Sequence, residues 1–338
     1  MAGQNLSYQP NEFGVSIAPE STIGTAETTT VRLHVDSVSL PSINPIQDLA
    51  PKSNSFVAQD DFVYHTTKGT PLEVTFGGLL NSTALSMLEG ILHTAASSNL
   101  ITVTDSYTAP VLSHGESSAA ATRTYTVKIV SPQTFDDDGS SNAANNTLTL
   151  VGACITAFSI SGDASGDGRL TYSATVKSGY HALFPSAAGS LSGPLTADIQ
   201  NIHDLTYRKI AGVTAPVMQS FTLSIENPAE YIGYDPVNTR PYSISRSVPE
   251  GPVVTLSSVV KLDQDTKGIL GNILNTSTVN NLVNHLSNNS SYSIASATIF
   301  SFDSDKAIVT GVSFNEQAAM MYSVEQKILF GTFKIRNS

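Results

Sequence analysis

Side chains that could bind a cation gather at one stretch of the sequence. Asp163, Ser165 and Asp167 stand at alternate positions and Gly168 follows them, which matches the first half of a calcium-binding loop. The twelfth position of such a loop requires a bidentate glutamate, and here it is Ala174. The stretch is therefore either a plain hairpin turn, which the missing glutamate favours, or a weak cation site.

The other reactive side chains form no recognisable catalytic set. The acidic cluster Asp136–Asp138 is typical of a solvated loop, and Cys154 lies on the apolar side of an alternating stretch, as a buried, inert thiol does. The sequence has no nucleophile elbow, phosphate-binding loop or dinucleotide fingerprint. We therefore expect no catalytic residue, cofactor or metal site. The histidines lack zinc-enzyme spacing; they are His34, His65, His93, His114, His181, His203 and His285.

The charge balance restricts the possible partners. Only 13% of the 338 residues are charged, against about 25% in a typical soluble protein. The formal net charge is −11 and only 17 residues are lysine or arginine, so we do not expect a groove that grips nucleic acid. A surface poor in charge but rich in serine, threonine and asparagine suits extensive contact between proteins.

Cysteine content and the first residues bear on the cellular compartment. The single cysteine excludes an intramolecular disulfide framework and agrees with synthesis in a reducing cytoplasm. The first residues lack a basic stretch followed by an apolar one, and no run of about 18 apolar residues occurs in the sequence. We expect neither secretion nor membrane insertion.

Alternation of apolar and polar residues dominates the chain and predicts half-buried strands. Apolar residues alternate over 31–36, and again over 148–160, where Gly152 is the expected point of bending. They alternate a third time over 170–177, after the turn residues 161–168. The last two stretches therefore predict a long β-hairpin.

Helical spacing occurs at two places. The first predicted helix begins at Asn81 and Ser82, both good N-caps, and the second spans about 265–286. Many strands with one helix per half indicate an α+β or mainly β fold. The apolar positions of the first helix are Leu85, Leu88, Ile91, Leu92 and Ala95.

The two halves of the chain resemble each other in the order of their patterns. Residues 31–36 align with 221–226, 73–80 with 253–260, 157–160 with 311–314, and Tyr172-Ser173 with Tyr322-Ser323. We infer a tandem duplication, although chance similarity among short strands is the alternative. The linker composition of 186–194 sets the predicted domains at 1–188 and 189–338.

The segment 41–70 is long for a loop inside a compact domain and too apolar for simple disorder. We expect something to cover it, and another copy of the protein is one candidate. Its apolar residues include Ile43, Ile46, Leu49, Phe56, Phe62, Val63 and Tyr64.

Together these patterns resemble bacteriophage tail tube proteins, the subunits whose stacked rings form the bore of a long tail. The resemblance rests on the stretches 216–227 and 150–160, on the long segment after the first strand and on the strand that leads into a helix. The family pattern of glycine, cysteine and isoleucine matches Gly152, Cys154 and Ile160, while the second half keeps Gly311 but has no cysteine.

The resemblance implies a β-sandwich or half-barrel unit with one flanking helix, whose inner strands join in the assembled ring into a continuous β-barrel. Single-domain relatives form hexamers, so two units in one chain imply a ring of three chains with pseudo-sixfold symmetry. The implied partners are other copies of the chain, the tape measure protein, the tail terminator and the distal tail or baseplate proteins. The implied location is the tail of the virion, and DNA would pass through the lumen without specific binding.

Two sets of residues follow as candidates for these contacts. Polar residues opposite the core face are candidates to line the lumen, with ordinary outer surface as the alternative: Arg32, His34, Asp36, Thr222, Ser224 and Glu226. Apolar residues of 41–70 are candidates to reach the adjacent ring: Ile43, Ile46, Leu49, Phe56, Phe62 and Tyr64. A capsid, decoration or adhesin-like β-sandwich protein is the competing interpretation. A polysaccharide hydrolase would need paired carboxylates across a cleft, and the sequence pairs none.

Overall fold

The computed structural model describes residues 12–41, 46–49, 63–66, 71–104, 107, 109–131, 147–182, 195, 198–210, 213–214, 217–235, 240–246, 251–264, 266–267, 292–296, 300–304, 307–316, 320–328 and 333–336. These residues form antiparallel sheets with two short helices, α1 (Ser82–Leu85) and α2 (Leu88–Leu92), so the predicted mainly β class is confirmed. No helix in this part of the chain is long and apolar enough to cross a membrane.

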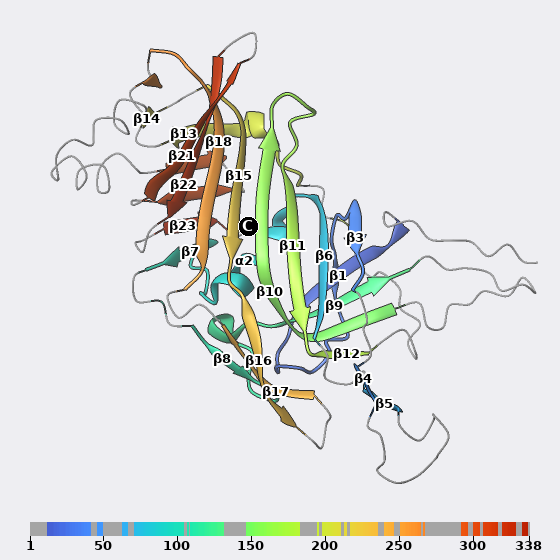
Figure 1. Cartoon of the computed structure of the whole chain (residues 1–338). Coiled ribbons are helices and arrows are strands. Elements are labelled where there is room, and N and C mark those ends of the chain that lie inside the picture. Colours follow the sequence, from blue (N-terminus) through green and yellow to red (C-terminus); the bar gives the residue numbers. More distant parts are fainter. Residues whose placement is uncertain are drawn as a thin grey trace, which may run out of the picture.

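One long antiparallel sheet runs through both halves of the chain (Figure 1). We call it the long sheet, and its strands lie in the order β3-β6-β11-β10-β15-β18-β22-β21. The first half supplies β3 (Ser37–Ser39), β6 (Leu72–Leu79), β11 (Thr171–Ser178) and β10 (Thr147–Asp163). The second half supplies β15 (Met218–Glu226), β18 (Val253–Lys261), β22 (Met320–Ile328) and β21 (Ala307–Glu316).

Strand β10 belongs to two layers because it bends near its middle. Its first part pairs with β9 (Tyr125–Val130) and β12 (Tyr180–Ala182), and its second part pairs with β11 and β15. The sheet of the first part continues through β1 (Gly14–Pro19) to β2 (Val31–Arg32), which makes a 12-stranded sheet in all. Gly152 at the bend has a φ of 57°, a left-handed conformation that favours glycine, as predicted for this position.

Three smaller sheets complete the fold and interlock the halves. A 6-stranded sheet contains β14 (Val213–Thr214), β13 (Leu205–Ile210), β19 (Tyr292–Ser296), β20 (Ser301–Ser304), β23 (Phe333–Arg336) and β7 (Leu100–Val103). A 3-stranded sheet contains β16 (Ala229–Asp235), β17 (Arg240–Arg246) and β8 (Val111–Ser113). Strands β4 (Ile46–Leu49) and β5 (Val63–Thr66) pair only with each other. Because β7 and β8 come from the first half, each completes a sheet of the second.

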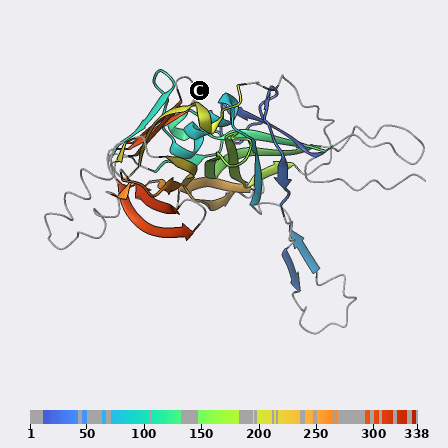
Figure 2. The same cartoon turned by 90° about the horizontal axis from the view of Figure 1, so that it is seen from above.

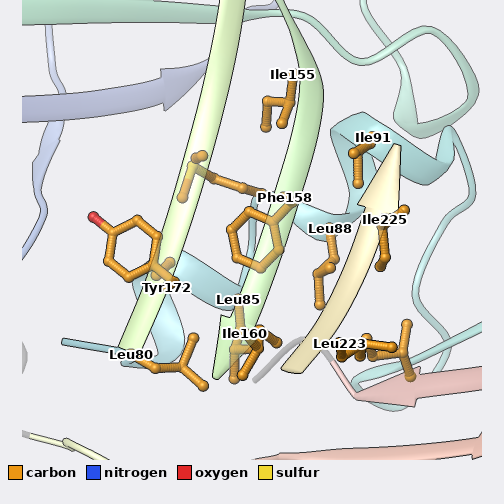
Figure 3. Close-up of a cluster of buried hydrophobic side chains, with 14 of the residues drawn as sticks. Leu80, Leu85, Leu88, Ile91, Ile155, Phe158, Ile160, Tyr172, Leu223 and Ile225 are labelled. Carbon is orange, nitrogen blue, oxygen red and sulfur yellow. The ribbon is translucent and has the colours of Figure 1, made fainter. Parts of the chain in front are cut away.

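The core lies behind one face of the long sheet, where the two helices pack, and it extends to buried residues of the 6-stranded sheet such as Phe302 and Ile335 (Figure 2). Figure 3 shows helix residues Leu85, Leu88 and Ile91 against side chains of β10, β11 and β15. The rings of Phe158 and Tyr172 stack there with centroids 6.0 Å apart. The alternation of the predicted strands thus places apolar residues toward the helices and polar ones away, as a sheet buried on one face requires.

The predicted hairpin, the N-cap and the strands near 253 and 221 are confirmed, but two local predictions were wrong. The predicted strand 31–36 is broken, because the chain changes partner within it. The amide of Leu33 still donates to the carbonyl of Val15 in β1 (3.0 Å), whereas the amide of Asp36 donates to the carbonyl of Gly77 in β6 (2.8 Å). The predicted helix is interrupted at Ser86, whose carbonyl accepts a hydrogen bond from the hydroxyl of Tyr125 (3.1 Å). It then ends at Leu92, so Ala95 is exposed rather than packed.

The strand order of the first half recurs in the second. The series β2-β1-β9-β10-β12 has the same order as β14-β13-β19-β20-β23, and β3-β6-β11-β10 the same as β15-β18-β22-β21. The β10–β11 pairing shifts between Ile155 and Ala157, and the β21–β22 pairing shifts between Val309 and Gly311. These bulges fall at positions that the sequence alignment of 157–160 with 311–314 already matches.

The recurrence corrects one part of the sequence alignment. Within the two series, β15 occupies the place of β3, and β14 the place of β2. Residues 221–226 therefore correspond to the segment that begins near Ser37, not to 31–36. The register agrees, because Ser37 faces Gly77 and Thr222 faces Ser257, and the sequence alignment equates those two partners.

Several predictions lie wholly or largely outside the described residues. The linker 186–194 is one, and most of the second predicted helix is another. Two hydrogen bonds are described at its predicted start: the amide of Thr266 donates to Asp263 Oδ1 (3.0 Å), and the amide of Lys267 donates to the carbonyl of Asp263 (3.0 Å). Asp263 thus caps a first turn next to the position predicted from the sequence.

Candidate functional site

In the described part of the chain, no helix and no other sheet covers one face of the long sheet, and Figure 1 views this face from the front. Residues that pair across neighbouring strands point to the same side of the sheet, so they form rows on this exposed face. Small polar residues predominate in these rows. One row runs from β3 at one edge to β22, next to the other edge: Ser37, Gly77, Ser173, Ser159, Ser224, Thr255 and Lys327. A neighbouring row consists of Leu79, Thr171, Ser161, Thr222, Ser257 and Glu325.

Hydroxyl groups on the exposed face bond to one another across strands. Thr75 and Thr175 have their Oγ1 atoms 3.0 Å apart, and Ser161 Oγ lies 2.9 Å from Thr171 Oγ1. Ser313 and Ser323 form the same kind of pair at the other end of the sheet. These side chains satisfy part of their hydrogen-bonding capacity within the sheet, so paired hydroxyl groups make up part of the polar face.

Charged side chains also lie on this face, among them Glu325 and Lys327 of the two rows. Glu73, Lys177 and Glu226 line a hollow at one end of the strands with Thr175 and Ala229. The ammonium group of Lys177 donates to the carbonyl of Ala229 (3.2 Å) and lies 5.8 Å from the ring centre of Tyr231. No arginine occurs in the described rows of the face, so the group best suited to clamp a phosphate is missing from them.

The structure brings three of the six lumen candidates together. Thr222, Ser224 and Glu226 lie on the exposed face along β15, a central strand of the sheet, and Glu226 is the last residue of that strand. Arg32 lies in β2, which belongs to the other layer, and His34 follows it outside any strand. Asp36 lies at the margin of the face, in a hollow lined also by Ser37 and Ser39.

The segment 41–70 contains a ribbon rather than only irregular structure. Ile46, Leu49 and Tyr64 lie in strands β4 and β5, which project from the body in Figure 2. Ile43, Phe56 and Phe62 lie outside the described residues. In the recurring strand order, β4 and β5 occupy the place of β16 and β17. The latter ribbon packs on the first half through β8, Ile23 and Leu112.

Both edges of the long sheet are open within the described chain. Strand β21 pairs only with β22, and β3 pairs only with β6. Near these edges, 56% of Phe314, 49% of Met320 and 41% of Leu40 are exposed. Unpaired strand edges with apolar neighbours invite pairing with another chain.

A buried polar cluster, which sequence reasoning missed, ties the two halves beneath this sheet. Arg246 of β17 donates to the carbonyls of Gly90 (3.0 Å), Ile155 (3.0 Å) and Asn227, and to His93 Nε2 (2.8 Å). Burial, with the Arg246 charge beside it, holds the pKa of His93 well below its usual value, so the imidazole is neutral and can accept. A charged residue gives no sequence signal for burial, because arginine is typical of surfaces.

The bend of β10 depends on a second buried group. Both oxygens of Glu20 accept hydrogen bonds, from the amides of Gly152 (2.7 Å) and Gly24 (2.9 Å) and from the hydroxyls of Thr124 (2.7 Å) and Thr126 (3.1 Å). Burial raises the pKa of this carboxyl, and the four donors oppose that shift. Cys154, two residues beyond the bend, is fully buried, which raises the pKa of its thiol to about 11.

The acidic turn has the structure of a hairpin turn. Asp163 Oδ1 accepts from the amide (2.8 Å) and the hydroxyl (2.6 Å) of Ser165, and Asp167 pairs with Arg169 (3.4 Å). The carboxylates therefore bond within their own turn instead of converging. In the described part of the chain, no group of three or more histidine, cysteine, aspartate or glutamate side chains is arranged to hold a metal ion.

Comparison with known proteins gives distant structural likeness only. A chain from the tail of an empty gene transfer agent particle, obtained by helical refinement with C6 symmetry, matches 39% of this chain and 96% of its own length, at 10% identity and a TM-score of 0.29. A chain from the virion of a native gene transfer agent particle matches the same shares, at 14% identity and a TM-score of 0.26. No protein-family model and no curated protein matches the sequence.

Proposed function

We propose that this chain is the structural subunit of a phage-type tail tube, a stack of rings through which DNA passes into a host cell. The observation that supports this most is the long sheet itself. Within the described chain it has one packed face, one face rich in hydroxyl groups and two open edges. A sheet of this kind can continue from chain to chain and close on itself, and closure removes the open edges.

The recurring strand order supports a tandem duplication of one tube unit. Each unit would contribute one strand series to the ring wall, so three chains would supply six units with pseudo-sixfold symmetry. The proposed units are 1–188 and 189–338. Within one chain the two units already join edge to edge, through β10 and β15.

The exposed face is proposed to line the lumen. Thr222, Ser224 and Glu226 keep the role expected from the sequence, and Ser37 and Ser39 take the place of Arg32, His34 and Asp36 in the first unit. A wall of hydroxyl groups offers phosphates few cations to bind, because DNA affinity rises with the number of phosphates that lysine and arginine neutralise. Acidic groups such as Glu226 add repulsion.

The segment 41–70 is proposed as an arm that contacts another copy. The sequence led us to expect that copy in the adjacent ring. The counterpart ribbon β16–β17 packs on the neighbouring unit of the same chain, which favours a neighbour within the ring. In either case the other copy would cover the apolar residues of the segment 41–70.

The remaining partners follow from this role. The chain would be made in the host cytoplasm and then reside in the virion tail. Its partners would be other copies of itself, the tape measure protein during assembly, and the tail terminator and distal tail or baseplate proteins at the two ends. The mechanism is structural: the chain provides a conduit and makes or breaks no bond.

Negative-stain electron microscopy of the concentrated, purified protein tests the proposal. Hollow tubes with a regular axial repeat are the expected result, and the mass of an isolated ring should equal three chains. A ring of six chains would refute the trimer. Closed shells, or monomers that an added tail initiator complex does not convert into tubes, would favour a capsid, decoration or adhesin-like protein.

A further inference from the structure

The junction between β10 and β15 shows how two units meet. Phe158 faces Ile225, Ser159 faces Ser224 and Ile160 faces Leu223 in antiparallel register. The apolar members of these pairs are buried: Ile160 is 0% exposed and Ile225 is 1% exposed. The serine pair lies on the exposed polar face. The junction is therefore an ordinary continuation of the sheet, with its apolar side covered.

Each strand of this junction has a counterpart at an open edge. Strand β21 takes the place of the second part of β10, with its bulge at Val309 and Gly311 where β10 has one at Ile155 and Ala157. Strand β3 takes the place of β15, because it begins the series and pairs with β6 as β15 pairs with β18. The two open edges are thus the two halves of a junction that the chain already forms internally.

We infer that β21 of one chain pairs with β3 of the next in the register of the internal junction. Ser313 would face the partner's Ser39, Phe314 would face the partner's Val38, and Val312 would face the partner's Leu40. The inference rests on the proposed self-assembly and adds to it the two contacting strands and their register. The occupant of both edges is a second copy of this chain.

The exposure of apolar residues at the two edges agrees with this register. Phe314 is 56% exposed, although its counterpart Ile160 is fully buried. Leu40 is 41% exposed, although its counterpart Ile225 is 1% exposed. In the internal junction the next strand covers such positions, and the inferred pairing would cover Phe314 and Leu40 in the same way. Sheet continuation would also pair the open backbone groups of β21.

Disulfide crosslinking between two variants, each with one cysteine added to the native Cys154, tests the register. Directly opposed residues in antiparallel strands have Cβ atoms about 4.5–5.5 Å apart, close to the spacing of a disulfide. Chains carrying Ser313→Cys are mixed with chains carrying Ser39→Cys, assembled and oxidised. We expect a covalent dimer on a denaturing, non-reducing gel from the mixture and none from either variant alone, because the native Cys154 is buried.

A second pair of cysteine variants distinguishes the inferred register from one that is displaced by two residues. Ser37 is exposed like Ser39 and lies two positions away on the same face, so Ser313→Cys mixed with Ser37→Cys should give no dimer. Crosslinking of that pair in place of the first would overturn the register. If tubes form and neither pair crosslinks, the edge contact is wrong while the proposed function stands. If neither tubes nor crosslinks form, both fail.

Removing the apolar contact provides a second test that needs no new cysteine. Phe314→Ser should raise the protein concentration needed for assembly roughly tenfold or more, as expected when the burial of a large apolar side chain is lost. Val111→Ser is the control, since Val111 is 55% exposed but lies on β8, away from both edges. Equal assembly thresholds for the two variants, with unchanged circular dichroism, would contradict the inferred contact.

Discussion

Arg246 lies where β17 of the second half meets α2 of the first, and its guanidinium bonds to three carbonyls and to His93. Arg246→Met would leave those buried acceptors without a donor. We expect the free energy of unfolding to fall by about 3 kcal/mol, the cost of several unsatisfied buried groups less the burial gained by methionine.

Urea titration of the unassembled chain measures this loss. Arg169→Met is the matched control, because Arg169 is largely exposed and pairs only with the exposed Asp167. Its removal should change the free energy of unfolding by no more than about 0.5 kcal/mol. Equal urea midpoints for the two variants would show that Arg246 does not tie the halves together.

Cys154 should be inert in the folded chain. Its side chain is fully buried and burial raises the pKa of the thiol to about 11, so at pH 8 it is a protonated thiol that reagents cannot reach. We expect no labelling by iodoacetamide in buffer and complete labelling in urea, measured by mass spectrometry. A Ser39→Cys variant should take up one label natively. Native labelling of Cys154 at the rate of that exposed site would contradict the buried position.

At the scale of elements, replacement of the arm, the segment 41–70, tests its role in assembly separately from the stability of the fold. Strands β4 and β5 pair only with each other, so replacing 42–70 with a short glycine-serine linker should leave the melting temperature nearly unchanged. We expect the shortened chain to stay monomeric, because the arm's counterpart β16–β17 packs on the neighbouring unit. Electron microscopy and gel filtration provide the readout. Single rings that do not stack would assign the arm to the adjacent ring, and normal tubes would refute an assembly role.

Elements with a strict polar and apolar alternation could be predicted from the sequence. Strands β11, β15, β18 and the second part of β10 fall in this class because in each the buried positions alternate with more exposed ones. The segment 31–36 alternates just as well, yet the chain changes partner after Leu33. Partner choice is a long-range property, so the pattern could not locate that break.

For the same reason, only part of the candidate site could be predicted from the sequence. Thr222 and Ser224 were found because they alternate with buried residues of a long strand. Ser37 and Ser39 belong to a strand of three residues, too short for a recognisable period. The buried Arg246 gave no local signal either, since its burial depends on carbonyls supplied by β10 and α2.

At the scale of the whole molecule, the two halves of the chain are not independent bodies. The 12-stranded sheet crosses between them at β10 and β15, β7 pairs with β23, and β8 pairs with β17. Each half alone would expose strand edges that the other half pairs. We therefore expect 1–188 and 189–338 to be insoluble or to lack cooperative melting when expressed separately, and to copurify as a folded complex when expressed together.

Substitutions on β15 can show whether such a complex forms through the sheet junction. Leu223 is 1% exposed and points into the core, whereas its neighbour Thr222 lies on the exposed face. Leu223→Asp in the second fragment should abolish copurification, because an unpaired carboxylate would be buried at the junction. Thr222→Asp should leave copurification intact. If both variants copurify equally, the halves join through some other surface, and the internal junction then no longer serves as a template for the contact between chains. If either half folds alone as a stable monomer, the expected dependence of the halves on each other is wrong.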